Sequence, residues 1–274
     1  MVLYNLGLRQ IPLAQSLGRI DVLDLHGQLA VITGAGGGIG RELVRTFLQA
    51  GAKVVACDID ASRMEGLNGV ERVAFDLTDV SACEAAARQI EGIGPIDILI
   101  NNAGGSRADT FDQVSDNMWR TEIDLNLNGA RHFTDRVLPG MRRRRAGTIV
   151  FIATVNASAH FGNPAYSAAK AGLVAYCKAL AVEYGRDGIR ANYVSPGSVI
   201  TSAWDGRLAA NPKLLDKVNS FYPLGRTVTV SEVSLATLFL ASNLASGITG
   251  TELLVDAGLT AGNLAFVNSV FRNQ

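Results

Sequence analysis

A tyrosine and a lysine four residues apart are the pair in this chain best suited to proton transfer. Tyr166 and Lys170 fall in a segment with helical spacing, so both side chains would lie on one face of a helix. A phenol with a pKa of about 10 is a poor acid or base at neutral pH, but a neighbouring cation favours the phenolate and lowers that pKa. Because a YxxxK spacing often arises by chance from a surface Tyr and Lys, the pair needs support from other segments.

A run of glycines between an apolar segment and an amphipathic one could bind a phosphate group. Residues 33–40 read TGAGGGIG. Glycine lets the backbone adopt positive φ angles and approach a pyrophosphate at a helix N-terminus. The spacing is GxxxGxG rather than GxGxxG, and a tight turn is the alternative, but a position between a strand and a helix favours a dinucleotide site. The residues expected to contact the dinucleotide are Gly34, Gly36, Gly37, Gly38, Ile39 and Gly40.

An acidic residue ends the next predicted strand. The carboxylate of Asp58 can accept hydrogen bonds from both hydroxyls of an adenosine ribose, and it would repel a 2′-phosphate. The glycine loop contains no Arg or Lys to neutralise such a phosphate, and Arg41 follows it on the helix. These features favour NAD over NADP. Asp58 could instead cap the next turn, which would be compatible with the same cofactor role.

Short β-rich runs alternate with helical segments from residue 25 onward. Continuous apolar strands indicate burial on both faces, as in a parallel sheet covered by helices on both sides. No Pro/Ser-rich or low-complexity stretch interrupts the alternation. We therefore predict that residues 25–274 form one α/β domain with a Rossmann fold, a doubly wound parallel sheet of about seven strands flanked by helices. The predicted strands are Leu29–Thr33, Lys53–Asp58, Arg72–Phe75, Ile96–Asn101, Gly147–Ala153, Ile189–Ser195 and Glu252–Asp256.

Composition excludes several classes of protein. The 25 basic and 25 acidic side chains cancel, which argues against binding to nucleic acid or to an anionic membrane surface. No apolar run approaches the length of about 18 residues needed to span a membrane, and residues 1–24 lack the basic start of a secretory signal, so we interpret them as an N-terminal extension. Three Cys without paired spacing indicate a reducing, cytoplasmic location, and the three dispersed His predict no metal site.

Further motifs, in order along the chain, make residues 25–262 resemble the short-chain dehydrogenase/reductase family. Besides the glycine loop and YxxxK, the chain carries DLTD at 76–79, NNAG at 101–104, DLNLNG at 124–129, SPGSVIT at 195–201 and a matching C-terminal strand over 247–258. Together with the glycine loop, these five segments make six ordered matches, which are far more specific than any one of them.

The resemblance implies a role for each matching residue. Tyr166 would be the general acid/base, Lys170 would bond the nicotinamide ribose and lower the Tyr166 pKa, and Asn126 would hold a water that relays protons. Hydride would pass directly between substrate carbon and nicotinamide. The remaining cofactor contacts implied by the family are Asp76, Leu77, Asn102, Ala103, Gly104, Pro196, Gly197, Val199 and Thr201.

The chain departs from the family pattern where a serine usually bonds the substrate oxygen. Residues 151–156 read FIATVN, without a serine at the strand end. Thr154 is the natural substitute because its hydroxyl offers the same donor and acceptor, while its methyl narrows the pocket. Ser158 is the alternative. If neither hydroxyl reaches the substrate, we expect weak or absent activity.

In the family, the segment after the Pro-Gly pair at 196–197 forms a variable substrate lid, here about residues 198–222. From it and neighbouring loops, Asn156, His160 and Trp204 are the substrate contacts we predict. Further polar and aromatic side chains there suggest a polyol, sugar or cyclic hydroxyketone rather than a steroid or fatty chain. Those side chains are Arg107, Asn163, Asp205, Arg207, Phe221 and Tyr222.

Taken together, these features predict an NAD-dependent oxidoreductase that interconverts a secondary alcohol and a ketone in either direction. A reductase of 3-oxoacyl thioesters is a second possibility, in which the arginines at 142–145 would dock an acyl carrier; a dinucleotide-binding sensor without catalysis is a third. Apolar helix faces near 112–137 and 165–184 exceed what one sheet face needs, so we expect a homotetramer or a homodimer.

Overall fold

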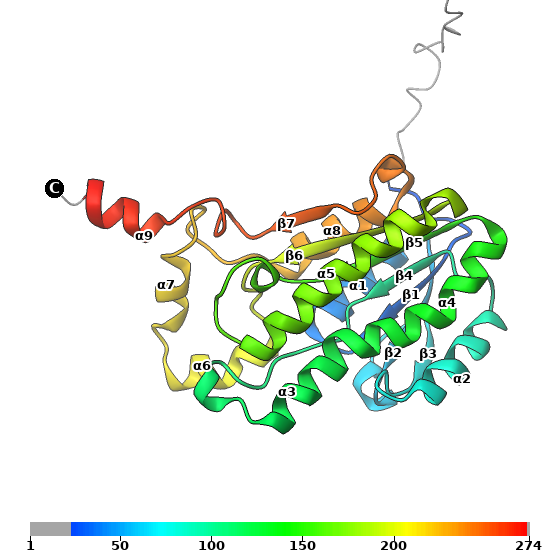
Figure 1. The fold of residues 1–274 in the computed structure, drawn as a ribbon, viewed down its shortest axis with the longest axis horizontal. Coiled ribbons are helices and arrows are strands. Elements are labelled where there is room, and N and C mark those ends of the chain that lie inside the picture. The colour runs from blue at the N-terminus through cyan, green and yellow to red at the C-terminus, as the bar shows by residue number, and fades with distance from the viewer. Residues whose placement is uncertain (1–22, 273–274) are drawn as a thin grey trace, which may run out of the picture.

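The protein, described by a computed structural model over residues 23–272, is built on one parallel sheet. Within that range seven strands pair in the order β3-β2-β1-β4-β5-β6-β7 (Figure 1). This confirms the predicted doubly wound fold, with strand ends displaced by at most two residues. The predicted extension lies outside the described residues except for its last two positions. The strands are β1 Leu29–Thr33, β2 Lys53–Asp58, β3 Glu71–Ala74, β4 Ile98–Asn101, β5 Gly147–Ile152, β6 Ile189–Pro196 and β7 Glu252–Val255.

Alternate residues of each central strand point into two separate hydrophobic cores. On β1, Leu29 and Val31 belong to one buried cluster, whereas Ala30 and Ile32 belong to the other. Because successive side chains of a strand point to opposite faces, both faces of this sheet must be covered. That requirement explains the continuous apolar runs in the sequence.

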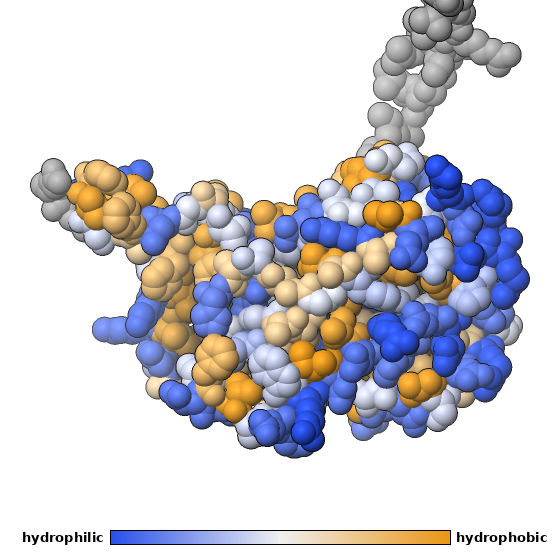
Figure 2. Space-filling view, in the orientation of Figure 1, coloured by the Kyte–Doolittle hydropathy of each residue, from blue (hydrophilic) through white to orange (hydrophobic). Residues whose placement is uncertain are grey.

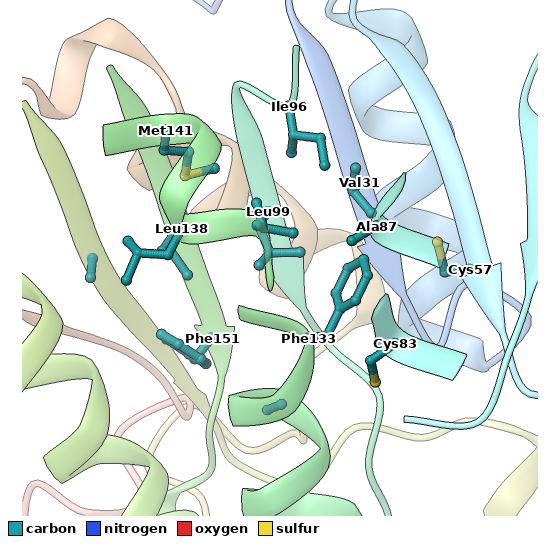
Figure 3. Packing of buried hydrophobic residues seen from close by; sticks show 14 of the residues in the cluster. Val31, Cys57, Cys83, Ala87, Ile96, Leu99, Phe133, Leu138, Met141 and Phe151 are labelled. Atoms are coloured by element: carbon teal, nitrogen blue, oxygen red, sulfur yellow. The ribbon is translucent and has the colours of Figure 1, made fainter. Parts of the chain in front are cut away.

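Helices form a layer on each face of the sheet. On one face α2 (Val80–Glu91), α4 (Ala130–Arg144) and α5 (Pro164–Tyr184) pack side by side; on the other, α1 (Gly38–Gln49) packs against α8 (Val230–Ala241). Figure 3 shows the first core, where Phe133 of α4 lies near Cys83 and Ala87 of α2. The shorter helices are α3 Asp116–Ile123, α6 Asp205–Ala210, α7 Leu214–Asn219 and α9 Leu264–Val267.

The order of the strands determines where a site can form. The chain moves from β1 outward to β2 and β3, then returns to place β4 on the other side of β1. Connections therefore leave the carboxyl ends of β1 and β4 in opposite directions and open a crevice between them, the usual ligand site of such sheets.

Two irregular segments lie near the crevice. A π-helical turn, Asp124–Gly129, joins α3 to α4. The predicted lid contains a 3-10 turn, Ser202–Trp204, followed by α6 and α7. In the part of the chain that the structure describes, no helix is both long enough and apolar enough to cross a membrane.

Candidate active site

A cleft of about 700 Å³ opens at the carboxyl ends of the central strands. It brings together the glycine loop, the end of β2, the segments after β4 and β5, the start of α5 and the beginning of the lid. Nearly all of the predicted cofactor contacts and three of the four predicted catalytic residues line it. The predicted residues in its wall are Gly34, Gly37, Gly38, Ile39, Gly40, Asp58, Asp76, Leu77, Asn102, Ala103, Gly104, Thr154, Tyr166, Lys170, Pro196, Gly197, Val199 and Thr201.

The glycine loop is held against the end of β4. The Asn102 side-chain amide donates to the carbonyls of Thr33 and Gly34 at 2.9 and 3.0 Å. Gly34 has a φ of +63°, and a Cβ built there would lie 2.7 Å from the Cα of Ala103. Only glycine fits this position, because a side chain would meet both an unfavourable φ and the neighbouring backbone.

The helix that follows the loop presents an uncompensated positive end. No side chain caps the N-terminus of α1, and no acidic residue lies in its first turn. The backbone dipoles of this 12-residue helix therefore favour a negative group beside Gly37. Together with the close-packed glycines, this end of the cleft fits the pyrophosphate of a dinucleotide.

Asp58, at the end of β2, contacts the middle of the glycine loop, and its carboxylate already accepts hydrogen bonds. The backbone N–H of Gly36 donates to Oδ2 and that of Ile59 to Oδ1, both at 2.9 Å. The guanidinium of Arg63 lies 3.0 Å from Oδ1. Sequence reasoning missed Arg63, which comes from the 3-10 turn Ala61–Met64 and also lines the cleft. In the sequence, only its position five residues after Asp58 could have indicated that it contacts this carboxylate.

Tyr166 and Lys170 lie on one face of the first turns of α5. Lys170 is 2% exposed, and its Nζ donates to the carbonyl of Ile152 at 2.8 Å. The same Nζ is 5.7 Å from the centroid of the Tyr166 ring. The ammonium therefore sits behind the phenol, bonded to the end of β5 and within reach of the cleft.

The expected lowering of the Tyr166 pKa does not arise from these residues alone. Burial raises the pKa of Tyr166 to about 12, and the nearby Thr154 hydroxyl only partly opposes this. Burial also lowers the pKa of Lys170 from 10.5 to about 8. The physical reason is desolvation, which disfavours the charged form of both groups and is the largest cause of each shift.

Asn126 is fully buried at the π-helical turn and does not line the cleft. Its amide nitrogen donates to the carbonyls of Gly105 and Glu122, and its Oδ1 accepts from the N–H of Gly105, all at 2.9 Å. A Cβ built on Gly104 would lie 2.5 Å from this Oδ1 and 3.2 Å from the Nζ of Lys170. Asn126 thus braces the segment after β4 directly beside Lys170.

The structure separates the two candidate hydroxyls. Thr154 is 8% exposed, lines the cleft and interacts with Tyr166. Ser158 is exposed, outside the cleft, and its hydroxyl donates to the carbonyl of Val155 at 3.2 Å. Geometry therefore favours Thr154 as the group beside the phenol.

The three predicted substrate residues do not line the cleft. Asn156 donates to the carbonyl of Gly162 at 2.9 Å, so its amide supports the loop before α5. His160 is exposed and stacks on Phe111 with ring centroids 6.4 Å apart. Trp204 lies beside the guanidinium of Arg207. Arg107, Ser202 and Ala203 line the cleft instead.

A buried glutamate supports the mouth of the cleft and was also missed. Glu122 is 2% exposed, and its Oε1 accepts from the N–H of Arg107 at 2.6 Å. Nothing in its sequence context marks it, because its burial depends on how α3 meets the loop after β4. In the lid, Tyr222 is buried and accepts from the N–H of Ser198 at 2.7 Å, so this predicted pocket residue anchors the lid.

The arginine run at the end of α4 is engaged locally. Arg142 pairs with Asp187 at 2.9 Å, and Arg144 donates to the carbonyl of Ile96. These residues precede β5, so they lie near the amino ends of the strands, across the sheet from the cleft. Among the described residues, no cluster of three or more His, Cys, Asp or Glu side chains could hold a metal ion.

Comparisons with known proteins agree with this geometry. A family model described as enoyl-(acyl carrier protein) reductase matches residues 34–260. The crystal structure of a short-chain dehydrogenase/reductase family oxidoreductase from Burkholderia thailandensis is 42% identical, with a TM-score of 0.86 over 90% of this chain and 98% of that one.

Two further proteins have named substrates or ligands. A galactitol 2-dehydrogenase (L-tagatose-forming) from Cereibacter sphaeroides is 33% identical over 87% of this chain and 97% of its own length. A gluconate 5-dehydrogenase from Burkholderia cenocepacia, solved in complex with NADP and tartrate, is 30% identical, with a TM-score of 0.83 over 89% of this chain and 99% of that one.

Proposed function

The chain belongs to the short-chain dehydrogenase/reductase family, an oxidoreductase family that acts on alcohol and ketone groups with a nicotinamide dinucleotide, and we propose that it is an NAD-dependent dehydrogenase of small polyhydroxylated substrates. The substrate would be a polyol, a sugar or a cyclic hydroxyketone. One observation carries the proposal: Thr154, Tyr166 and Lys170 line the same cleft as the glycine loop and Asp58.

Each of these side chains has a distinct proposed task. When bound, the dinucleotide supplies the hydride acceptor or donor. The Thr154 hydroxyl holds the substrate oxygen, and the Tyr166 phenol exchanges a proton with it. Lys170 orients the nicotinamide ribose, and its positive charge favours the phenolate in the assembled complex. Asn126 holds the segment beside Lys170 and, through a bound water, connects it to solvent.

The polar wall of the cleft supports a hydroxylated substrate. Arg107 and Ser202 are polar residues that line it, and Thr154 narrows it with one methyl group. The relative that acts on galactitol is a polyol dehydrogenase by its name. Asp58 supports NAD as the preferred cofactor, because its carboxylate suits ribose hydroxyls better than a 2′-phosphate.

A substrate panel tests the proposal directly. The wild-type chain is mixed with NAD and galactitol, other polyols, aldoses and cyclic diols, and NADH formation is followed by absorbance. Tyr166→Phe should lower kcat by at least about a thousandfold, since it removes the proton-transfer group. Tyr184→Phe is the matched control, on the same helix but stacked under Arg142 away from the cleft. Turnover unchanged in Tyr166→Phe would sink the proposed chemistry.

The two rival functions have less support. Docking of an acyl carrier on residues 142–145 would place it across the sheet from the cleft, and those arginines have partners such as Asp187 and Glu91. The sensor hypothesis would require loss of catalysis, although Asn126, Tyr166 and Lys170 are all retained. Measurable NAD binding without turnover of any substrate would favour it.

We also propose that the chain forms a homotetramer or a homodimer in the cytoplasm. The solvent-facing side of α5 carries a stripe of apolar residues at helical spacing (Figure 2). Its members are Ala168, Ala171, Ala175, Ala179 and Val182, the last of which is 83% exposed. Buried, unpaired Cys57, Cys83 and Cys177 suit a reducing compartment. Light scattering coupled to size-exclusion chromatography measures the assembly state.

A further inference from the structure

The adenosine end of the cleft contains a cation that its sequence motif does not reveal. Arg63 approaches Asp58 through its Nε, at 3.0 Å from Oδ1. No described residue accepts a hydrogen bond from its two terminal amino groups, and the side chain is 55% exposed where it lines the cleft. The guanidinium therefore has four N–H donors still available on the side of the cleft where the adenosine ribose would lie.

The position of Arg63 is held by the glycine loop and by α1. The Arg41 guanidinium donates to the carbonyls of Gly36, Glu65 and Arg63, the last at 2.6 Å. A Cβ on Gly36 would lie 2.4 Å from the Arg63 carbonyl oxygen. The backbone of the 3-10 turn is thus clamped onto the loop, so Arg63 is a fixed neighbour of the cofactor site rather than a free surface residue.

The number of hydrogen bonds that Asp58 can accept indicates how Arg63 affects cofactor binding. A carboxylate has about four acceptor sites. Gly36, Ile59 and Arg63 already use three of them. A ribose that offers two hydroxyls must therefore share or displace the contact from Arg63. A ribose that carries a 2′-phosphate meets the opposite situation, because the guanidinium already neutralises Asp58 and can bind the phosphate through its free donors.

We infer that Arg63 is a cofactor-selectivity residue: it binds the 2′-phosphate of NADP and lets this site accept NADP as well as NAD, despite the acidic residue at the end of β2. The inference rests on the proposed function and deepens it. It makes the Asp58–Arg63 pair, rather than Asp58 alone, the determinant of cofactor choice.

Binding measurements without substrate test this inference separately from catalysis. Dissociation constants for NAD and for NADP are measured by isothermal titration calorimetry on the full chain. We expect the two wild-type constants to lie within about tenfold of each other, because the exposed cation offsets much of the repulsion from Asp58. Arg63→Ala should weaken NADP binding by at least about tenfold and leave NAD binding equal or tighter. Arg63→Lys, which keeps the charge but loses the planar fork, should fall between them.

A charge-matched control separates a local contact from a general field. Arg45 lies on α1 and pairs with Glu42, outside the cleft, so Arg45→Ala removes the same charge and should leave the NADP-to-NAD ratio unchanged. The inference is overturned if the wild-type chain binds NAD but not NADP, or if Arg63→Ala leaves the ratio at its wild-type value. If neither dinucleotide binds the wild-type chain, the proposed function fails, and the inference with it.

Discussion

Replacing Lys170 with methionine should stabilise the fold while it abolishes the proposed activity. The ammonium is 2% exposed and has one hydrogen bond, to the carbonyl of Ile152. Burial lowers its pKa from 10.5 to about 8. At about 1.4 kcal/mol per pKa unit, keeping this group charged in the folded state costs about 3 kcal/mol near pH 7.

Part of the stability gained by removing the buried charge is lost again in the Lys170→Met variant. Methionine has a similar length and no charge, but it leaves the Ile152 carbonyl without its partner, at a cost of about 1 to 1.5 kcal/mol. The net expectation is that Lys170→Met raises the free energy of unfolding by about 2 kcal/mol at about pH 7. Such a gain is typical when a buried charge is held in place for function.

The difference in stability between Lys170→Met and the wild-type chain should depend on pH. The folded-state pKa of Lys170 lies below the unfolded-state value, so between about pH 8 and 10.5 the unfolded chain binds more protons. The wild-type chain therefore gains stability as the pH rises through this window, whereas the variant has no such gain. By about pH 9.5 the advantage of Lys170→Met should shrink by about 2 kcal/mol, to nearly zero.

Urea denaturation at both pH values, followed by tryptophan fluorescence and circular dichroism, measures these differences. Lys178→Met, an exposed position on the same helix, is the matched control and should change stability by less than about 0.5 kcal/mol. A Lys170→Met variant that is less stable than wild type at pH 7, or a difference that does not change with pH, would refute the reasoning.

Three further substitutions test the site. Thr154→Ala should lower kcat/KM by about 10- to 100-fold in the NADH assay, because it removes the hydrogen bond proposed to the substrate oxygen. Ser158→Ala is the control and should have no effect. The reverse pattern would contradict the geometry. Gly104→Ala places a Cβ 2.5 Å from the Oδ1 of Asn126, so kcat should fall by about tenfold or more, with a melting temperature within a few degrees of wild type. Tyr222→Phe removes the acceptor that holds the lid and should cost about 1 kcal/mol of stability in urea while it raises KM; an unchanged KM would show that the lid does not depend on this bond.

The fold was predictable from the sequence because its signals are local. Seven short runs flanked by turn residues predict strands, and their positions agree with the structure to within two residues. The glycine loop was likewise recognisable from its place between a strand and a helix. Tyr166 and Lys170 share a helical face by spacing alone, so their proximity needed no tertiary information.

The substrate side was less predictable, because it depends on which loops face the cleft. Asn156, His160 and Trp204 have the side chains of substrate ligands, but their loops turn them toward other partners. Nothing in the sequence distinguishes a polar residue that faces the cleft from one that braces the loop behind it. For the same reason the sequence left Thr154 and Ser158 as alternatives, which only the end of β5 separates.

By itself, the sequence determined the α/β architecture, and it predicted the proposed dinucleotide loop and the proposed proton-transfer pair, since each depends on residues close together along the chain. Only the tertiary structure decided how those groups are charged and partnered. Packing desolvates Lys170 and Tyr166 and so sets the direction of both pKa shifts. It also brings Arg63 onto Asp58. Such effects arise from burial and from contacts between separate elements, which no spacing along one segment encodes.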